Sequence, residues 1–221
     1  MESVLNNIKL KFDNDGFIVN ENLINQVDLE AIEKWISELN DSKEVNHHYE
    51  KTVNGKVLSR TENFVSSHTS FREFLLSSSI KDYLTMLFDD EPILFKEKIN
   101  YKYPGGAGYA PHQDAFPLDS YQLNENGGQR VATALLYLNT PTEGGATSFP
   151  SINGGRGYEV QARKGRCVFF TTTFLGLQEP HPFSLHGAMP LIKGRKYVAN
   201  CWFRQHQRWA YKTPEDTDQS D

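Results

Sequence analysis

Hydrophobic residues in the first ninety positions of the chain recur mainly at helical spacing. In residues 29–39, leucines and isoleucines stand three or four positions apart, and Asp28 precedes them. This spacing puts the side chains on one face of an α-helix, and aspartate is a preferred helix cap. A second stretch, about 71–88, predicts another helix with core candidates Phe71, Phe74, Leu75, Tyr83, Leu84 and Leu87.

The segment between these helices, residues 42–67, is polar and contains the dipeptide Asn54-Gly55. This dipeptide favours a tight hairpin turn. The same region, at residues 52–67, and residues 115–129 are long enough to be loops that close over a bound substrate.

After residue 92 the pattern changes from helical to strand-like. Residues 93–103 alternate between apolar and polar types, and continuous apolar runs occupy 131–139, 166–174 and 196–203. Short strands joined by segments rich in glycine, proline and asparagine predict a β-sandwich or barrel. We expect one domain over 1–221, with helical support or a lid at 1–92, a β core at 93–205 and a polar tail at 206–221.

Composition narrows the function classes. The chain has 221 residues, a net charge of −5, 12% aromatic residues and no run rich in lysine and arginine. We therefore expect a packed globular protein without a nucleic-acid partner. No apolar run has the length of a membrane span or a signal peptide, so no membrane association and a cytoplasmic location are expected. Cys167 and Cys201 lie in apolar runs and are predicted to be buried free thiols, although a disulfide stays open.

The tripeptide His112-Gln113-Asp114 is a candidate metal site. On a strand, residues two apart point to the same side, so this imidazole and carboxylate could bind one ion. With a second histidine they would form the facial triad that suits iron(II). A similar pair, His48 and Glu50, has no strand pattern around it and is interpreted as solvated surface.

The third metal ligand has three candidates among the later histidines. His181 lies between two prolines, which suits a loop, and His206 follows the last predicted strand. His186 begins a block that ends in a strongly apolar strand, and it is the ligand we predict.

A dicarboxylic keto acid bound to this metal by one end would need a buried cation for its other end. Lys196 stands ten residues after His186, at the start of an apolar strand. Its neighbour Arg195 would point to the opposite face of a regular strand, so only one of the two can serve.

Several spaced motifs occur in the order found in one family. They are YPGGAGYAPHQD, GGQRVATALLYLNTPTEGGATSFP and LHGAMPLIKGRKYVANCWF, within residues 98–204. This half of the chain resembles the catalytic domain of prolyl 4-hydroxylases. The resemblance implies a double-stranded β-helix (jelly-roll) fold, iron(II) at His112, Asp114 and His186, and 2-oxoglutarate at Lys196.

The resemblance also implies roles for residues around the co-substrate. Tyr103 and Tyr137 match tyrosines that bind 2-oxoglutarate in relatives, and Trp202 matches a tryptophan that lines the pocket. Arg195 matches the arginine that serves in the hypoxia-sensing relatives, so it is the alternative to Lys196. Both tyrosines are also readily explained as plain core aromatics.

The resemblance leaves the substrate open. The segment FKEKINYKYPGG before the His-x-Asp motif also looks like the phytanoyl-CoA dioxygenase group, and Lys196-Tyr197 replaces the usual lysine-tryptophan pair. The substrate is thus either a prolyl residue in a peptide or a small metabolite such as a free amino acid. The expected reaction couples oxidative decarboxylation of 2-oxoglutarate by O2 to C–H hydroxylation, with ascorbate as a possible reductant. The oligomeric state is not predicted.

Two further hypotheses are disfavoured by intact residues. Halogenases of this superfamily replace the carboxylate ligand with a small residue, whereas Asp114 is present. A binding module without catalysis would be expected to lose its motif residues, whereas His112, Asp114, His186 and Lys196 are all retained.

Overall fold

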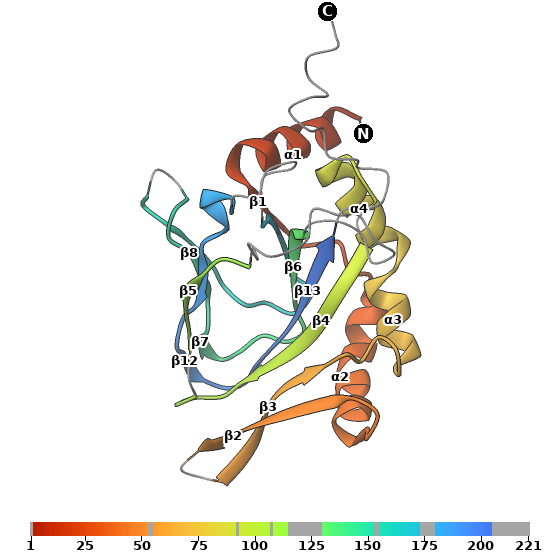
Figure 1. Ribbon diagram of the computed structural model, residues 1–221, viewed down its shortest axis with the longest axis vertical. Helices are drawn as coiled ribbons and strands as arrows, with labels where there is room; N and C mark the ends of the chain where they lie inside the picture. The colour runs from red at the N-terminus through yellow and green to blue at the C-terminus, as the bar shows by residue number, and fades with distance from the viewer. Residues whose placement is uncertain are drawn as a thin grey trace, which may run out of the picture.

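The computed structural model describes residues 2–52, 55–91, 93–106, 108–114, 130–152, 155–172 and 180–204. Its strands form a seven-stranded sheet, a four-stranded sheet and a two-stranded sheet. Figure 1 shows helices α2, α3 and α4 along one side of the large sheet and the four-stranded sheet on its other side.

Four helices precede the β core: α1 (Glu2–Asp15), α2 (Gln26–Asp41), α3 (Thr69–Leu75) and α4 (Ser78–Phe88). The predicted helix cap is corrected here: α2 is capped by Asn25, whose side chain accepts a 2.9 Å hydrogen bond from the Asp28 backbone. The helix predicted at 71–88 is divided in two, because Ser77 has extended backbone angles and begins α4 as its N-cap.

The large sheet runs in the order β1-β10-β6-β13-β4-β3-β2, and all of its neighbouring strands are antiparallel. The four strands predicted from apolar patterns lie at its centre as β4 (Ile93–Lys102), β6 (Arg130–Tyr137), β10 (Cys167–Thr171) and β13 (Lys196–Arg204). The prediction missed β1 (Phe17–Asn20).

The predicted hairpin is present as β2 (Asn46–Thr52) and β3 (Gly55–Glu62). Because β3 pairs with β4, residues 55–62 are sheet, and the proposal that 52–67 is a closing loop was wrong. His48 was expected outside any strand but lies in β2; it is exposed, 3.6 Å from the Glu62 carboxylate. The other proposed loop, 115–129, and the predicted tail, 206–221, lie outside the described residues.

The smaller sheet has the order β5-β11-β8-β9, with β5 (Tyr109–His112), β11 (His186–Ala188), β8 (Thr147–Phe149) and β9 (Tyr158–Val160). A two-stranded sheet joins β7 (Glu143–Gly144) to β12 (Leu191–Lys193). At Gly144, φ is +77° and a Cβ atom would lie 2.7 Å from the Pro190 carbonyl oxygen, so the glycine permits this close approach. Two antiparallel sheets facing each other agree with the predicted double-stranded β-helix.

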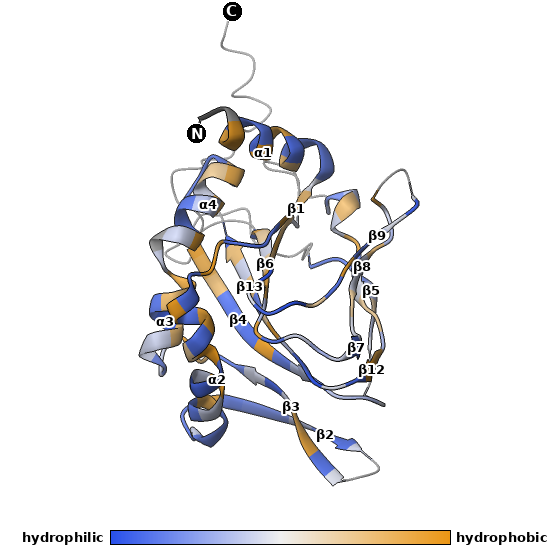
Figure 2. Ribbon diagram, turned by 180° about the vertical axis from the view of Figure 1, so that it is seen from behind, coloured by the Kyte–Doolittle hydropathy of each residue, from blue (hydrophilic) through white to orange (hydrophobic). Residues whose placement is uncertain are grey.

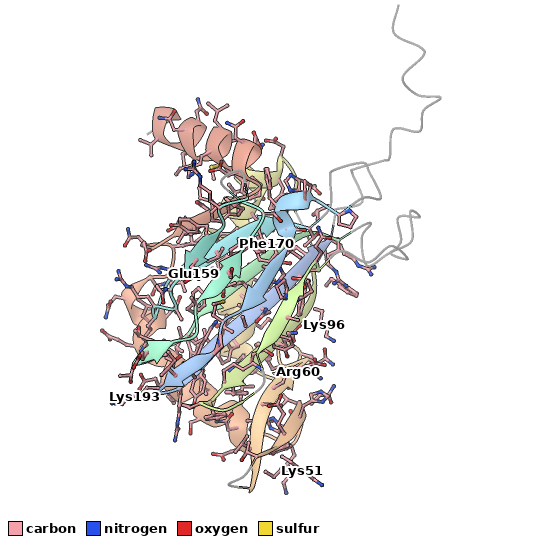
Figure 3. The ribbon with its side chains drawn as sticks, turned by 90° about the vertical axis from the view of Figure 1, so that its left-hand side faces the viewer. Lys51, Arg60, Lys96, Glu159, Phe170 and Lys193 are labelled. Atoms are coloured by element: carbon pink, nitrogen blue, oxygen red, sulfur yellow. The ribbon has the colours of Figure 1, made fainter. Side chains whose placement is uncertain are left out.

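The core has two parts, one on each side of the large sheet. One cluster packs the helices against the sheet, and the other fills the space between the two sheets. Phe170 belongs to the second cluster and lies among the strands in Figure 3. Polar colouring dominates β2 at the far edge of the sheet, as Figure 2 shows.

Both cysteines are buried free thiols, as predicted. Among the described helices, none is long and apolar enough to cross a membrane.

Candidate metal and co-substrate site

The three predicted metal ligands converge in the space between the two sheets. His112 on β5 is the register partner of His186 on β11, and Asp114 follows β5 by two residues. The Asp114 carboxylate lies 3.6 Å from Nε2 of His112 and 3.7 Å from Nε2 of His186. One ligand atom from each residue can be chosen so that all three lie within 4.8 Å of one another. This is the only such cluster of three or more ligand-type residues in the described part of the chain.

Hydrogen bonds fix which nitrogen of each histidine faces the site. Nδ1 of His112 lies 2.9 Å from the Ala110 carbonyl oxygen, and Nδ1 of His186 lies 2.8 Å from that of Ser184. Because a carbonyl oxygen only accepts, Nδ1 must carry the hydrogen, and Nε2 of the neutral ring keeps its lone pair. Two imidazole nitrogens and one carboxylate therefore fit a divalent metal such as iron(II).

The Asp114 carboxylate is held by strand β6. Thr133 Oγ1 donates a 2.9 Å hydrogen bond to Asp114 Oδ2, and the Arg130 guanidinium donates one of 2.9 Å to the Asp114 carbonyl oxygen. The sequence prediction recognised the motif that contains Arg130 and Thr133 but gave neither a role. The available signal was two buried polar residues in an otherwise apolar strand.

His186 is enclosed by aromatic rings. Its ring centroid lies 4.7 Å from that of Phe170 and 4.5 Å from that of His112. Burial lowers the pKa of His186, so the ring stays neutral, which is the form that binds metal.

A cavity lined by residues of both sheets adjoins the three ligands. The large sheet contributes charged and polar residues to its wall as well as Val198 and Leu135. Its polar and aromatic lining beyond the ligands includes Lys98, Lys102, Tyr109, Thr147, Lys196 and Trp202.

Lys196 lines this cavity and is 3% exposed. Burial, with a smaller contribution from nearby Lys102, lowers the pKa of Lys196 to about 8. In the part of the chain that the structure describes, no carboxylate forms an ion pair with its ammonium. A buried cation without a counter-ion is costly to the fold, and a bound anion would offset that cost.

The remaining predicted co-substrate residues are divided between the cavity and its surroundings. Trp202 lines the cavity. Tyr137 is fully buried; its hydroxyl donates a 2.7 Å hydrogen bond to Oγ1 of Thr147, which lines the cavity. Tyr103 lies beside Lys196 in a smaller adjoining hollow. Arg195 is exposed on the opposite face of the strand, in another hollow, so the geometry favours Lys196 over Arg195.

Two lysines in the cavity wall were missed from the sequence. Lys98 and Lys102 on β4 alternate with the buried residues Ile99 and Tyr101 and line the cavity. The alternation of 93–103 was recognised, but its polar positions were given no role.

Residues 99–204 match the model of the 2OG-Fe(II) oxygenase superfamily. This segment is a 2OG-Fe(II) oxygenase domain. Superfamily members use iron(II) and 2-oxoglutarate, in agreement with the triad and the buried lysine found in the cavity.

Two relatives illustrate the similarity. The chain is 36% identical over 109 residues to a methylphosphonate hydroxylase of Gimesia maris, covering 48% of this chain and 42% of that protein. It is 35% identical over 164 residues to prolyl 4-hydroxylase 13 of Arabidopsis thaliana, covering 68% of this chain and 58% of that protein. The chain thus spans about half the length of these relatives.

The fold also matches a viral collagen prolyl hydroxylase of Paramecium Bursaria Chlorella virus-1, solved with 2OG. The TM-score is 0.65 at 20% identity, and the match covers 88% of this chain and 98% of that one. This likeness supports the jelly-roll fold. The recognition of a prolyl 4-hydroxylase-like domain from its motifs is confirmed.

Proposed function

We propose that this protein is an iron(II)- and 2-oxoglutarate-dependent hydroxylase. The observation that carries the proposal is the presence, in one cavity, of the His112, Asp114 and His186 ligands and the buried Lys196 without a counter-ion. In this proposal the three ligands hold iron(II), and Lys196 binds the far carboxylate of 2-oxoglutarate.

Iron(II), when bound, supplies the activation of O2 that couples decarboxylation of 2-oxoglutarate to succinate with hydroxylation of a C–H bond. The protein's own residues position these reactants and keep the carboxylate ligand in place. Asp114 is held by Thr133 and leaves no vacant ligand position for chloride, which favours hydroxylation over halogenation. Thr147 lines the cavity that also contains the metal ligands and Lys196, and the Tyr137 hydroxyl donates a hydrogen bond to Thr147.

Two substrate classes fit the proposal. A prolyl residue in a peptide is supported by the similarity to prolyl 4-hydroxylases. A small anionic metabolite is supported by the similarity to the methylphosphonate hydroxylase and by the three lysines that line the cavity. A cytoplasmic location and the absence of a nucleic-acid partner remain predictions.

The test is 2-oxoglutarate turnover by the iron-loaded protein, with ascorbate added and O2 as oxidant. Succinate is measured with proline-rich peptides, free amino acids and methylphosphonate in separate reactions. We expect one class to stimulate succinate formation, Asp114→Ala to abolish it, and Lys196→Ala mainly to raise the 2-oxoglutarate requirement.

An anaerobic titration gives a second readout. Iron(II) with 2-oxoglutarate should produce a weak visible charge-transfer band in the parent protein and none in His112→Ala. If the parent shows no band and His112→Ala binds both ligands equally well, the protein is a binding module and the proposal is lost.

A further inference from the structure

The lysines in the cavity occupy two separate places along strands β4 and β13. Lys102 is the register partner of Lys196, whereas Lys98 is the partner of Asn200, four residues further along. At about 3.3 Å per residue, these places are roughly 13 Å apart along the strand. The cavity therefore has a Lys196 end and a Lys98 end.

The metal ligands lie toward the Lys98 end. Asp114 is bonded to Thr133, and the register partner of Thr133 is Trp202. The Lys98 ammonium lies 4.7 Å from the centroid of the Trp202 ring. Lys98 is paired with Asn200, two residues from Trp202 and four from Lys196, so it lies near the level of the metal ligands and away from the Lys196 end.

The charges in the cavity are unequal after metal and co-substrate are counted. The two positive charges of iron(II) are matched by the two negative charges of 2-oxoglutarate. Lys98 and Lys196, which form no ion pair among the described residues, then share the cavity lining with one carboxylate, that of Asp114. A further anion would compensate part of this positive charge.

Lys98 itself is placed to meet such an anion. Its ammonium lies over the rings of Trp202 and Tyr109, at 4.7 and 5.5 Å from their centroids, and it forms no ion pair among the described residues. Burial lowers the pKa of Lys98 to about 8. The Trp202 indole Nε1 is a second buried donor without an acceptor in the same wall.

We infer that Lys98, with Trp202 and Tyr109, forms a subsite for an anionic group of the primary substrate, such as a carboxylate or phosphonate on a small molecule. The inference rests on the proposed function and favours the second of its two substrate classes. Lys98 sets substrate specificity through charge, while the apolar faces of the two rings confine the ammonium.

The experiment measures binding without turnover, using protein loaded with manganese(II) and 2-oxoglutarate. The probes are butyrate, its neutral analogue butyramide and inorganic phosphate, followed by ligand-observed NMR. Lys98→Met removes the charge and Lys98→Arg retains it. Lys164→Met is the matched control, because Lys164 pairs with Glu33 at 3.3 Å and does not line the cavity.

We expect butyrate or phosphate to bind at least tenfold more tightly than butyramide binds. This preference should be lost in Lys98→Met, be largely kept in Lys98→Arg and be unchanged in Lys164→Met. The affinity for 2-oxoglutarate should change less than twofold in Lys98→Met.

Two results would overturn the inference. In the first, the anions bind Lys98→Met as tightly as they bind the parent protein. In the second, Lys98→Met weakens the binding of 2-oxoglutarate as much as that of the anion, which would place Lys98 in the co-substrate site. Failure of the proposed function is seen separately, as a parent protein that does not bind 2-oxoglutarate. The same anion titration on metal-free protein then tests Lys98 alone.

Discussion

At the scale of single residues, the metal site depends on partners that orient its ligands. The Thr133 hydroxyl is the only described side chain that donates a hydrogen bond to the Asp114 carboxylate. Removing such a partner commonly weakens metal binding by roughly 10- to 100-fold. We therefore expect Thr133→Val, which keeps the side-chain shape, to weaken manganese(II) binding by a factor in this range.

Calorimetric titration of the metal checks this prediction. Thr61→Val is the matched control, because Thr61 is also buried in the large sheet but bonds His47, far along the chain from the ligands. Equal affinity in the parent and in Thr133→Val would show that the hydroxyl does not orient Asp114.

The lowered pKa of Lys196 predicts how co-substrate binding depends on pH. As the pH rises through about 8, Lys196 loses its proton in the protein without 2-oxoglutarate. The co-substrate carboxylate then has no cation to bind. The dissociation constant of 2-oxoglutarate should be nearly flat below pH 8 and then rise up to about tenfold per pH unit. Lys196→Arg stays charged, so its profile should lack this rise; identical profiles for the two proteins would contradict the prediction.

The sequence contained enough information to find the ligands but not the whole cavity. His112, Asp114, His186 and Lys196 were identified from their spacing and strand context and then from the family motifs, and the structure brings them together. Lys98 was not found, since alternation on a strand shows which residues share a face but not whether that face meets solvent or a cavity.

At the scale of elements, the metal ligands depend on how closely β5 and β11 approach. A Cβ atom on Gly187 would lie 3.2 Å from both the Tyr109 carbonyl oxygen and the Pro111 nitrogen. These are backbone atoms of β5, so the strand itself must shift to admit a methyl group.

Gly187→Ala should therefore move His186 relative to His112 and lower metal affinity about tenfold, because ligand geometry tolerates little displacement. The overall fold should persist, as judged by an unchanged far-ultraviolet circular dichroism spectrum. Unchanged manganese(II) affinity in a folded Gly187→Ala protein would show that the strands adjust without moving the ligands.

Strand prediction succeeded where the chain is apolar over many residues and failed where strands are short. β6 and β13 are long and mostly buried, so their continuous apolar sequences predicted them as strands. β8, β9 and β11 have three residues each, too few to show a period, and their pairing is set by tertiary contacts. The polar hairpin strand β2 lies at a sheet edge, where one-sided burial leaves a weak pattern.

At the scale of the whole molecule, the two thiols report on opening of the core. Cys167 and Cys201 lie on β10 and β13, on either side of β6, and burial raises the pKa of both. An aromatic disulfide reagent should therefore modify them only as fast as the core opens, and fully in denaturant.

The measurement compares the labelling rate with the global unfolding rate at the same pH. Bound manganese(II) and 2-oxoglutarate should slow the labelling, because they bind only the folded state. Rapid labelling of both thiols in the folded protein would contradict the central position of these strands.

The carbonyl bonds on the two histidine rings have a consequence for how the protein acquires iron. Each neutral ring directs the lone pair of Nε2 toward the site, because Nδ1 is held by the backbone carbonyl two residues earlier. Binding of the metal ion therefore requires no rotation of either ring and no loss of a proton from it. Metal binding near pH 7 should therefore leave the pH of a weakly buffered solution unchanged. A site made of cysteine thiols would release protons on binding metal and lower that pH.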